Sequence, residues 1–399
     1  MIRMKIPLSA PDVSLAEVEA VAEVLRSSRL SLGPKLEEFE HAIAVYNGAP
    51  YAIGVSSGTA ALHLCMVAFG IRPGDEVIVP SFTFVAVANA IRYVGASPVF
   101  VDIDPITLNM DPDRTEAAIT NKTRAIVAVH TFGYPADMDA LLTIARRHGL
   151  LLIEDACEAI GAEFQGRKVG SLGDAGVFAF YPNKQITTGE GGMIVTRDSV
   201  VAKKIRALRN QGRYETDDWF QNSELGFNYR LSEMHCALGC AQMKRIESIL
   251  TAREAVARAY HQLLGNCTDI VLPPAYAPQG RISWFVYVVR LRERFTRIQR
   301  DAVLKHFALA EIGCGRYFAP IHMQPSYGEW RSSYSLPVTE SVSARTLALP
   351  FFNKLSQTDV QHVCAVLREA LECLTEPHFS GKSTKGAHDP YRRESSNGH

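Results

Sequence analysis

The sequence has no net charge and no long apolar run. Its 42 Lys and Arg residues equal its 42 Asp and Glu residues, so charge gives no case for a nucleic-acid or anionic-membrane partner. No apolar stretch approaches the ~20 residues of a membrane-spanning helix. Residues 1–7 lack the apolar core of a signal peptide. These absences predict a cytoplasmic chain.

Metal-binding cysteine pairs and a dinucleotide fingerprint are also missing. The eight cysteines include no Cys-x-x-Cys pair, and no Gly-x-Gly-x-x-Gly motif occurs, which disfavours a zinc site and a dehydrogenase. Cys236 and Cys240 stand four residues apart beside His235, but no second ligand pair follows. We therefore predict no metal site, and expect both cysteines to pack in a helix with reduced thiols.

Short β-rich segments recur between residues 50 and 200. The expected strands are Glu76–Pro80, Pro98–Ile103, Ala125–His130, Leu150–Ile153, Gly176–Phe180 and Gly192–Thr196. Helices are expected between many of them, at Ala60–Phe69, Phe84–Val94 and Met138–His148. This alternation predicts a mainly parallel sheet covered on both faces. In such sheets the chemistry collects at the carboxyl ends of the strands.

The flanking regions are predicted to be more helical. A capping pattern over residues 14–17 begins a helical N-terminal segment, and residues 200–260 are expected to be mainly helical. A Pro-rich turn precedes a strand at Trp284–Leu291 and a final helix capped by Ser356. We expect a large domain over residues 1–255, a smaller α/β domain over 256–375, and a polar, disordered tail over 376–399.

Two short segments could bind parts of a phosphorylated, cationic ring. Gly58 and Thr59 open a helix, where free N–H groups and the helix dipole favour a phosphate. An ordinary helix cap at Ser57 is the alternative explanation. Asp155 lies at the carboxyl end of a strand. Its carboxylate could hold a protonated ring nitrogen, or serve only as a turn cap.

A third segment contains a lysine in an unusually shaped loop. Lys184 follows a strand end and is surrounded by Pro, Asn and several Gly residues. Lysines in turns are usually solvated, but this placement offers the reach and partial desolvation that a Schiff-base lysine needs. Phe84 could cover a ring face, or could be a core aromatic residue. A phosphate cradle, a ring-nitrogen carboxylate and an imine lysine together predict a pyridoxal 5'-phosphate (PLP) enzyme.

Longer motifs extend around these residues. They are Ser57-Gly58-Thr59-Ala60-Ala61-Leu62, Pro80-Ser81-Phe82-Thr83-Phe84, Glu154-Asp155-Ala156-Cys157, Asn183-Lys184-Gln185-Ile186-Thr187-Thr188-Gly189-Glu190-Gly191-Gly192, Gly226-Phe227-Asn228-Tyr229-Arg230-Leu231-Ser232-Glu233 and Pro320-Ile321-His322-Met323-Gln324-Pro325. In these motifs, and from about residue 5 to residue 373, the chain resembles the nucleotide-sugar aminotransferases of the DegT/StrS family.

The resemblance implies a fold and a set of site residues. The fold would be aspartate-aminotransferase-like (PLP fold type I), with a homodimer whose subunits share active sites. Lys184 would be the catalytic lysine. The residues implied to bind the cofactor are Gly58, Thr59, Phe84, Asp155, Glu158, Lys184, Asn228 and Arg230, the last two reaching in from the partner subunit. His322 would lie near the sugar, in a segment that resembles the family's sugar-side loop, and Arg316 and Arg281 are candidates for binding a substrate carboxylate.

Three positions depart from the commoner family pattern. Ala179 replaces a serine that often binds the cofactor phosphate, and Thr187 or Thr188 could supply that contact instead. Glu158 stands where His or Gln is frequent, and Gln211 stands where His is common. Glu158 could act on the cofactor's ring oxygen or on substrate choice. None of these changes removes a group that transamination requires.

The function implied by the resemblance is amino transfer from L-glutamate to a nucleotide-linked keto-deoxysugar, in amino sugar biosynthesis for a surface polysaccharide or a secondary metabolite. Two alternatives remain. A pyridoxamine-phosphate-dependent dehydratase has the same fold, but such relatives replace the lysine found here at position 184. A non-catalytic PLP-binding regulator would need a DNA-binding helix pair or a basic face, and the sequence indicates neither. The sequence leaves open the nucleotide, the sugar, the keto position and the product stereochemistry.

Overall fold

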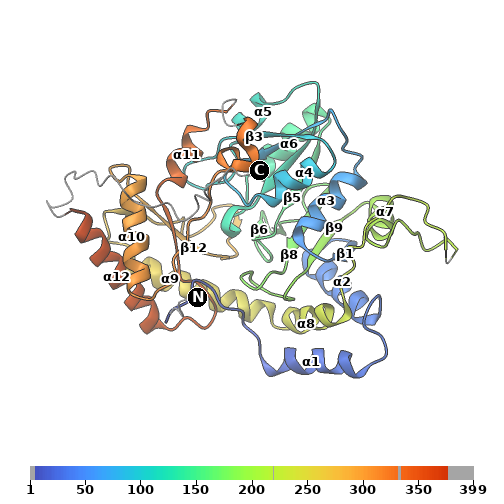
Figure 1. Cartoon of the computed structure of the whole chain (residues 1–399), viewed down its shortest axis with the longest axis horizontal. Helices are drawn as coiled ribbons and strands as arrows, with labels where there is room; N and C mark the ends of the chain where they lie inside the picture. The colour runs from blue at the N-terminus through green and yellow to red at the C-terminus, as the bar shows by residue number, and fades with distance from the viewer. Residues whose placement is uncertain (1–4, 219, 331–333, 376–399) are drawn as a thin grey trace, which may run out of the picture.

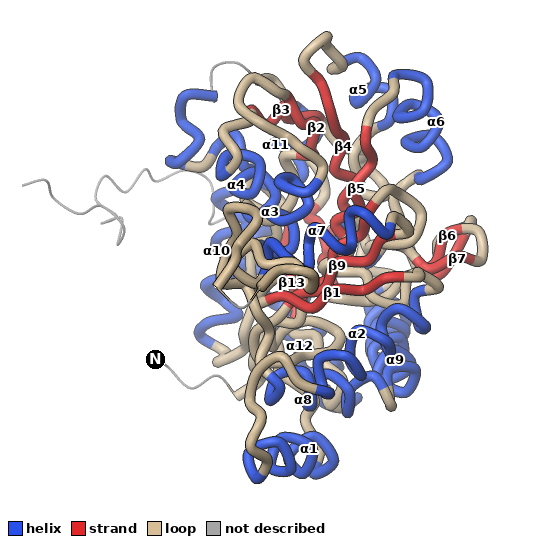
Figure 2. The backbone as a smooth tube through the Cα atoms, turned by 90° about the vertical axis from the view of Figure 1, so that its right-hand side faces the viewer, coloured by secondary structure: helices blue, strands red, loops and turns tan. Residues whose placement is uncertain are grey.

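The computed structural model describes residues 5–218, 220–330 and 334–375. Its centre is a seven-stranded sheet, which Figure 2 shows as a twisted stack of strands between helices. Neighbouring strands in this sheet follow the order β1 (Tyr51–Val55), β9 (Gly192–Thr196), β8 (Ala175–Ala179), β5 (Leu151–Asp155), β4 (Thr123–Val129), β2 (Glu76–Pro80) and β3 (Ser97–Val101). Only β9 runs antiparallel to its neighbours. The predicted α/β class with a mainly parallel sheet is confirmed.

Helices cover both faces of this sheet. One face packs against α2 (Pro34–Asn47), α6 (Met138–His148), α8 (Glu233–Met243) and the start of α9 (Ile246–Leu264). The other packs against α3 (Gly58–Ala68), α4 (Ala86–Tyr93) and α7 (Ser199–Arg209). The strands are buried on both faces, which explains their nearly continuous apolar sequences. Two further helices, α1 (Leu15–Arg26) against α8 and α5 (Pro112–Ala117) beside α6, complete this part.

A second core lies on the α10–α12 side of the molecule (Figure 1). It consists of a three-stranded sheet in the order β10 (Ile270–Val271), β12 (Tyr287–Leu291) and β13 (Thr346–Leu349), packed by α9, α10 (Arg297–Leu309) and α12 (Gln357–Thr375). A small third sheet joins β11 (Gly280–Arg281), β6 (Glu163–Phe164) and β7 (Arg167–Lys168). The expected domain limits at residues 255 and 375 stay predictions, and the tail 376–399 lies outside the described residues.

The segment between α10 and α12 returns to the large sheet. It contains the short 3₁₀ helices η2 (Ile321–Met323) and η3 (Pro325–Trp330) and the helix α11 (Pro337–Ser343). Ile321 and Leu336 are buried in the core that α3 and α4 form with the sheet. The buried Asp102 carboxylate accepts hydrogen bonds from Val338 N (3.0 Å) and Thr339 N (2.7 Å), so it caps α11. The late segment is thereby fixed to the end of β3.

Several predicted bounds are confirmed, and others are wrong for identifiable reasons. The bounds of β2, β9 and α6 agree with the predictions, and Ser14 and Glu17 form a capping box. The strand expected from Trp284 begins only at Tyr287, because Arg253 takes the carbonyls of Trp284 and Phe285 out of the ladder.

Two further expectations were incomplete. Residues 210–218 and 220–232 form no helix, although residues 200–260 were expected to be mainly helical. Strand β1 was not predicted at all. Cys236 and Cys240 are buried in α8, as expected of packed helix residues. Over the part of the chain that the structure describes, no helix has both the length and the apolar character needed to cross a membrane.

Candidate active site

The ends of six parallel strands meet at one edge of the large sheet. Strands β1, β2, β3, β4, β5 and β8 all end there, and antiparallel β9 begins there. Gly192 pairs with both Val55 and Ala179 in the ladders, and Asp155 pairs with Val129. The segments after these ends are therefore neighbours in space. They contain every residue from Gly58 to Lys184 that the sequence placed in the site.

The start of α3 packs directly on this edge. Ser57 accepts a hydrogen bond from Ala60 N (3.1 Å) and so is the helix cap. A Cβ on Gly58 would lie 2.7 Å from the Ala179 Cβ, and a Cβ on Gly192 would lie 2.4 Å from the Ser57 carbonyl oxygen. Only glycine permits such close backbone approach. The N–H groups of Gly58 and the half-buried Thr59 are the first of α3, so they have no acceptor within the helix and are held in place by this tight turn.

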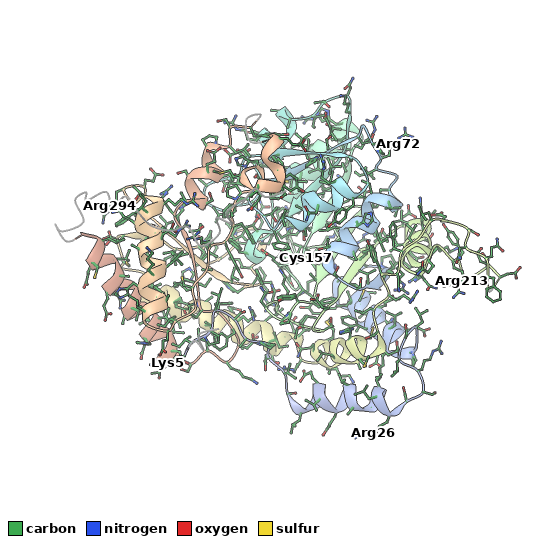
Figure 3. All side chains as sticks on the ribbon, viewed as in Figure 1. Lys5, Arg26, Arg72, Cys157, Arg213 and Arg294 are labelled. Atoms are coloured by element: carbon green, nitrogen blue, oxygen red, sulfur yellow. The ribbon has the colours of Figure 1, made fainter. Side chains whose placement is uncertain are left out.

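Asp155 is the last residue of β5, and its side chain is 8% exposed. One oxygen accepts a hydrogen bond from Cys157 N (3.1 Å). Figure 3 labels Cys157 near the middle of the molecule. Burial raises the pKa of the Cys157 thiol well above its usual value, and the Asp155 charge adds to this. No cation in the described residues forms a salt bridge with Asp155. A buried carboxylate of this kind fits a cationic partner such as a protonated ring nitrogen.

Lys184 lies in the loop after β8, with its side chain only 14% exposed. Its Nζ is 3.5 Å from Glu158 Oε1 and 4.1 Å from the centre of the Phe285 ring. The preceding Asn183 has a buried Oδ1 without a hydrogen-bond partner among the described residues. The lysine is therefore desolvated and held between a carboxylate and an aromatic face, not solvated as a surface lysine would be.

Glu158 is fixed by contacts on both oxygens. Oε2 accepts a hydrogen bond from Phe132 N (3.0 Å), and Oε1 faces Lys184. Burial raises the pKa of the Glu158 carboxyl, and the Lys184 charge partly offsets this. Gln185 donates to the Glu158 carbonyl (2.6 Å) and to Ser283 O (3.0 Å). The departure at position 158 therefore places a carboxylate beside the candidate catalytic amine.

A wall of stacked aromatic rings stands next to Lys184. Phe285 stacks on Tyr317 (6.4 Å between centroids, 8° between planes), and Tyr317 stacks on Phe318 (5.3 Å, 6°). Phe318 in turn contacts Phe132 and Phe82. Burial raises the pKa of the Tyr317 hydroxyl, the Glu158 charge adds to this, and a hydrogen bond with Asn183 opposes it. Sequence reasoning missed Tyr317, although it directly follows the candidate Arg316.

The other predicted residues lie at different distances from this centre. Phe84 is 61% exposed, so it is not a core aromatic residue and its ring is free to cover a ligand. His322 is buried at the end of β2, where its ring contacts Ser81 and Glu340. Arg316 is half exposed and pairs with Asp301 (3.1 Å). Arg281 lies on β11 and pairs with Glu247 (3.1 Å).

The motif expected to serve a partner subunit lies beside β1. Tyr229 O accepts a hydrogen bond from Ser56 N (2.9 Å), directly before the turn at Gly58. Asn228 is exposed, and Arg230 Nη1 donates to Asn210 Oδ1 (3.0 Å). Gln211 has a left-handed backbone (φ 63°), and its N–H donates to Phe227 O (2.9 Å). This segment leaves the Asn228 side chain directed away from the chain's own core.

The suggested replacements for the missing serine have other contacts. Thr187 Oγ1 donates to Phe180 O (3.0 Å) and accepts from Gly189 N (2.9 Å). Thr188 Oγ1 donates to Glu190 O (2.6 Å). Both residues are buried, so their hydroxyls shape the lysine loop. Neither is placed as a phosphate ligand.

Comparison with known proteins agrees with this geometry. The sequence model of the DegT/DnrJ/EryC1/StrS aminotransferase family matches residues 11–368. The chain belongs to this family. It is therefore an aminotransferase, and it is 43% identical over 373 residues to the GDP-perosamine synthase of Caulobacter vibrioides, which covers 92% of this chain and 98% of that one.

Solved aminotransferase structures share the fold over almost the whole chain. DesV of S. venezuelae, determined in complex with a ketimine intermediate, is 38% identical with a TM-score of 0.84, covering 91% of this chain and 98% of its own. Spr1654 of Streptococcus pneumoniae, named as a sugar aminotransferase, is 27% identical with a TM-score of 0.88, covering 93% of this chain and 100% of its own. It was solved in PMP and PLP forms. The fold is that of the type I PLP aminotransferases.

Proposed function

We propose that this chain is a PLP-dependent aminotransferase that uses L-glutamate to aminate a nucleotide-linked ketosugar, with a GDP-linked sugar as the first candidate. The observation that best supports the cofactor is the desolvated Lys184 at the same sheet edge as Asp155 and the Gly58 turn. The full-length similarity to a GDP-perosamine synthase supports the substrate class and the nucleotide.

The residues present fit this cofactor. The N–H groups of Gly58 and Thr59 would hold its phosphate, Asp155 its ring nitrogen, and Phe84 one face of its ring. Glu158 would lie near the imine end, since it lies 3.5 Å from Lys184 Nζ. The chemistry supplied by bound PLP is electron withdrawal from the carbon that loses or gains a proton.

Lys184 would move that proton. Its Nζ would accept the proton at the substrate carbon and return it one position further along, as a general base and then a general acid. The Glu158 carboxylate would stabilise the charged amine between these steps. Asp155 would keep the ring nitrogen protonated. Arg316 would bind on the substrate side and His322 would lie near it, with Arg281 a more remote alternative because it pairs with Glu247.

The direct test is a pair of single-turnover experiments on PLP-loaded protein. Glutamate should convert the cofactor to its pyridoxamine form, and a GDP-linked ketosugar should then convert it back while the sugar gains an amino group. Absorbance follows the cofactor, and mass spectrometry follows the sugar. If ordinary 2-oxo acids restore the PLP form but nucleotide ketosugars do not, the sugar assignment is wrong.

We further propose a homodimer in which Asn228 and Arg230 complete the partner's site. Support comes from the exposed Asn228 side chain beside the turn at Gly58. Asn228→Ala should weaken cofactor retention. Mixed dimers of Asn228→Ala and Lys184→Ala chains should regain activity, because one site in each hybrid has both residues intact. Hybrids no more active than either parent would mean that each site is built within one chain.

A further inference from the structure

His322 makes a short chain of contacts with two other side chains. Its Nδ1 lies 2.7 Å from Ser81 Oγ, and its Nε2 lies 3.3 Å from Glu340 Oε1. Ser81 and His322 are both almost completely buried. Ser81 directly follows β2, so the contact joins the edge of the large sheet to a residue 241 positions later in the chain.

The partners define the hydrogen on each atom of this chain. The Glu340 carboxylate can only accept, so the hydrogen of the neutral His322 ring lies on Nε2, which faces it. Nδ1 then accepts from the Ser81 hydroxyl, whose oxygen still has lone pairs to accept from His322 N (3.2 Å). Both ring nitrogens are thus used within the protein.

The same contact fixes one end of a short segment next to Lys184. Ile321 N donates to Ser81 O (2.9 Å), and His322 N donates to Ser81 Oγ, so η2 is tied to the end of β2 at three points. At the other end, Gly315 and Ala348 of β13 exchange two backbone hydrogen bonds (3.1 and 2.9 Å). Residues 316–320 are therefore held between the two sheets.

Those five residues include two rings of the aromatic stack that continues from Phe285 beside Lys184. Tyr317 stacks on Phe285, whose ring lies 4.1 Å from Lys184 Nζ, and Phe318 packs on Phe82, next to Ser81 in sequence. We propose that His322 is a positioning residue for the sugar half of the reaction. Its Nδ1 holds the segment 316–322 on Ser81, and so places Tyr317 and Phe318 beside Lys184, while its ring makes no contact with the sugar. This inference rests on the proposed function for its kinetic arm only.

The two nitrogens of His322 can be tested separately. Asparagine can present its amide oxygen near the Nδ1 position, so His322→Asn keeps an acceptor for Ser81 while removing Nε2. His322→Leu removes both, and Ser81→Ala removes the partner. The first measurement is hydrogen exchange of the amides in residues 316–325 of the full chain without added ligand. Exchange should rise about 10-fold or more in His322→Leu and Ser81→Ala, and should stay near that of the unmodified protein in His322→Asn.

The second measurement uses PLP-loaded protein in single turnover with two alternative amino donors, L-glutamate and GDP-perosamine. With GDP-perosamine, His322→Leu and Ser81→Ala should each be slowed about 10–100-fold, and the double variant should be no slower than either. His322→Asn should stay within about 5-fold, and the rate with glutamate should stay within about 3-fold in all four variants.

Each contrary result has a definite meaning. Unchanged hydrogen exchange in Ser81→Ala would overturn the proposal. So would a GDP-perosamine rate as slow in His322→Asn as in His322→Leu while Ser81→Ala reacts normally, because Nε2 would then act on the sugar. An equal loss with both donors would also overturn it, since it would show general damage to the site. The exchange results could hold while neither the unmodified protein nor any variant reacts with GDP-perosamine. In that case the positioning contact stands, and the choice of nucleotide sugar in the proposed function is wrong.

Discussion

Two neighbouring carboxylates at the end of β5 face opposite surroundings. Glu154 is completely buried and accepts hydrogen bonds from His130 (3.0 Å) and from the backbone of Gly170 (2.6 Å), Leu172 (2.7 Å) and Gly173 (2.7 Å). Asp155 points to the other face of the sheet and accepts from Cys157 N. Glu154 already has its partners within the fold, whereas Asp155 has room for one more. The two residues are neighbours in sequence. Their hydrogen-bond partners therefore separate the structural role of Glu154 from the chemical role expected of Asp155.

The Asp155 face should be the reactive one, and Lys184 tests this most strongly. Lys184→Ala should lower the turnover number by at least ~1,000-fold, because it removes the amine that would move the proton at this sheet edge. Borohydride reduction of the PLP-loaded protein should attach a pyridoxyl group at position 184, read by peptide mapping. Lys168→Ala, which removes a lysine paired with Glu163 on a surface hairpin, is the matched control. A label on another lysine would refute the assignment.

Asp155→Asn should separate activity from stability. An amide cannot keep a ring nitrogen protonated, so turnover should fall by about 100-fold. The fold should persist, since the amide oxygen can still accept from Cys157 N. Steady-state kinetics and thermal unfolding check the two parts. Turnover near that of the unmodified protein would remove Asp155 from the mechanism.

Glu154→Gln should show the opposite pattern. The amide would place an NH₂ group, itself a donor, against N–H groups that now donate to the Glu154 carboxylate. This should lower the free energy of unfolding by about 2–4 kcal/mol. Turnover of the folded protein should change little. Glu116→Gln, which breaks a solvent-exposed pair with Arg147, should lower the free energy of unfolding far less. Denaturant unfolding compares the two, and equal losses would contradict the distinction.

A third buried carboxylate predicts how stability responds to acid. Burial disfavours the charged form of Glu17, but hydrogen bonds from Ser14, Arg245 and Gln242 outweigh this and lower its pKa from 4.5 to about 2. Since the folded-state pKa is depressed, this stabilisation is complete above pH 4.5 and is lost as pH falls toward 2. About 1–3 kcal/mol should disappear over that window.

The matching variant is Glu17→Gln, which should flatten the acid side of the stability profile while leaving the neutral side displaced downward. Glu19→Gln, on the exposed side of the same helix, is the control. Unfolding measured between pH 2.5 and 7 checks both. A profile for Glu17→Gln parallel to that of the unmodified protein would show that another carboxylate dominates.

Local sequence sufficed where a residue's role depends on its own segment. The bounds of β2, β9 and α6, and the strand-end placement of Asp155, follow from apolar runs and their neighbouring turns. Strand β1 was missed because its five residues include Gly54 and pair with β9 some 140 positions later. A single segment contains no information about such a partner.

The same limit applies to the candidate site. The loop around Lys184 is recognisable from its Pro, Asn and Gly residues, but nothing local shows that Thr187 is used by Phe180 O and Gly189 N. Tyr317 and Glu158 meet beside Lys184 only because elements of both cores converge there. The position of His322 against Ser81 likewise depends on a contact across 241 residues.

One helix start depends on a residue that is synthesised much later. Glu233 accepts hydrogen bonds from the backbone of Gly33 (3.0 Å), Lys35 (2.8 Å) and Leu36 (3.0 Å), and so caps α2 from about 200 positions away. Ribosomes add about 5–20 residues per second, so α2 leaves the ribosome some 10–40 s before its cap exists. Strand β1 likewise has no partner in the sheet until β9 is synthesised. An N-terminal fragment ending before residue 233 therefore lacks the cap of α2, and its apolar surfaces stay exposed to chaperones during that interval.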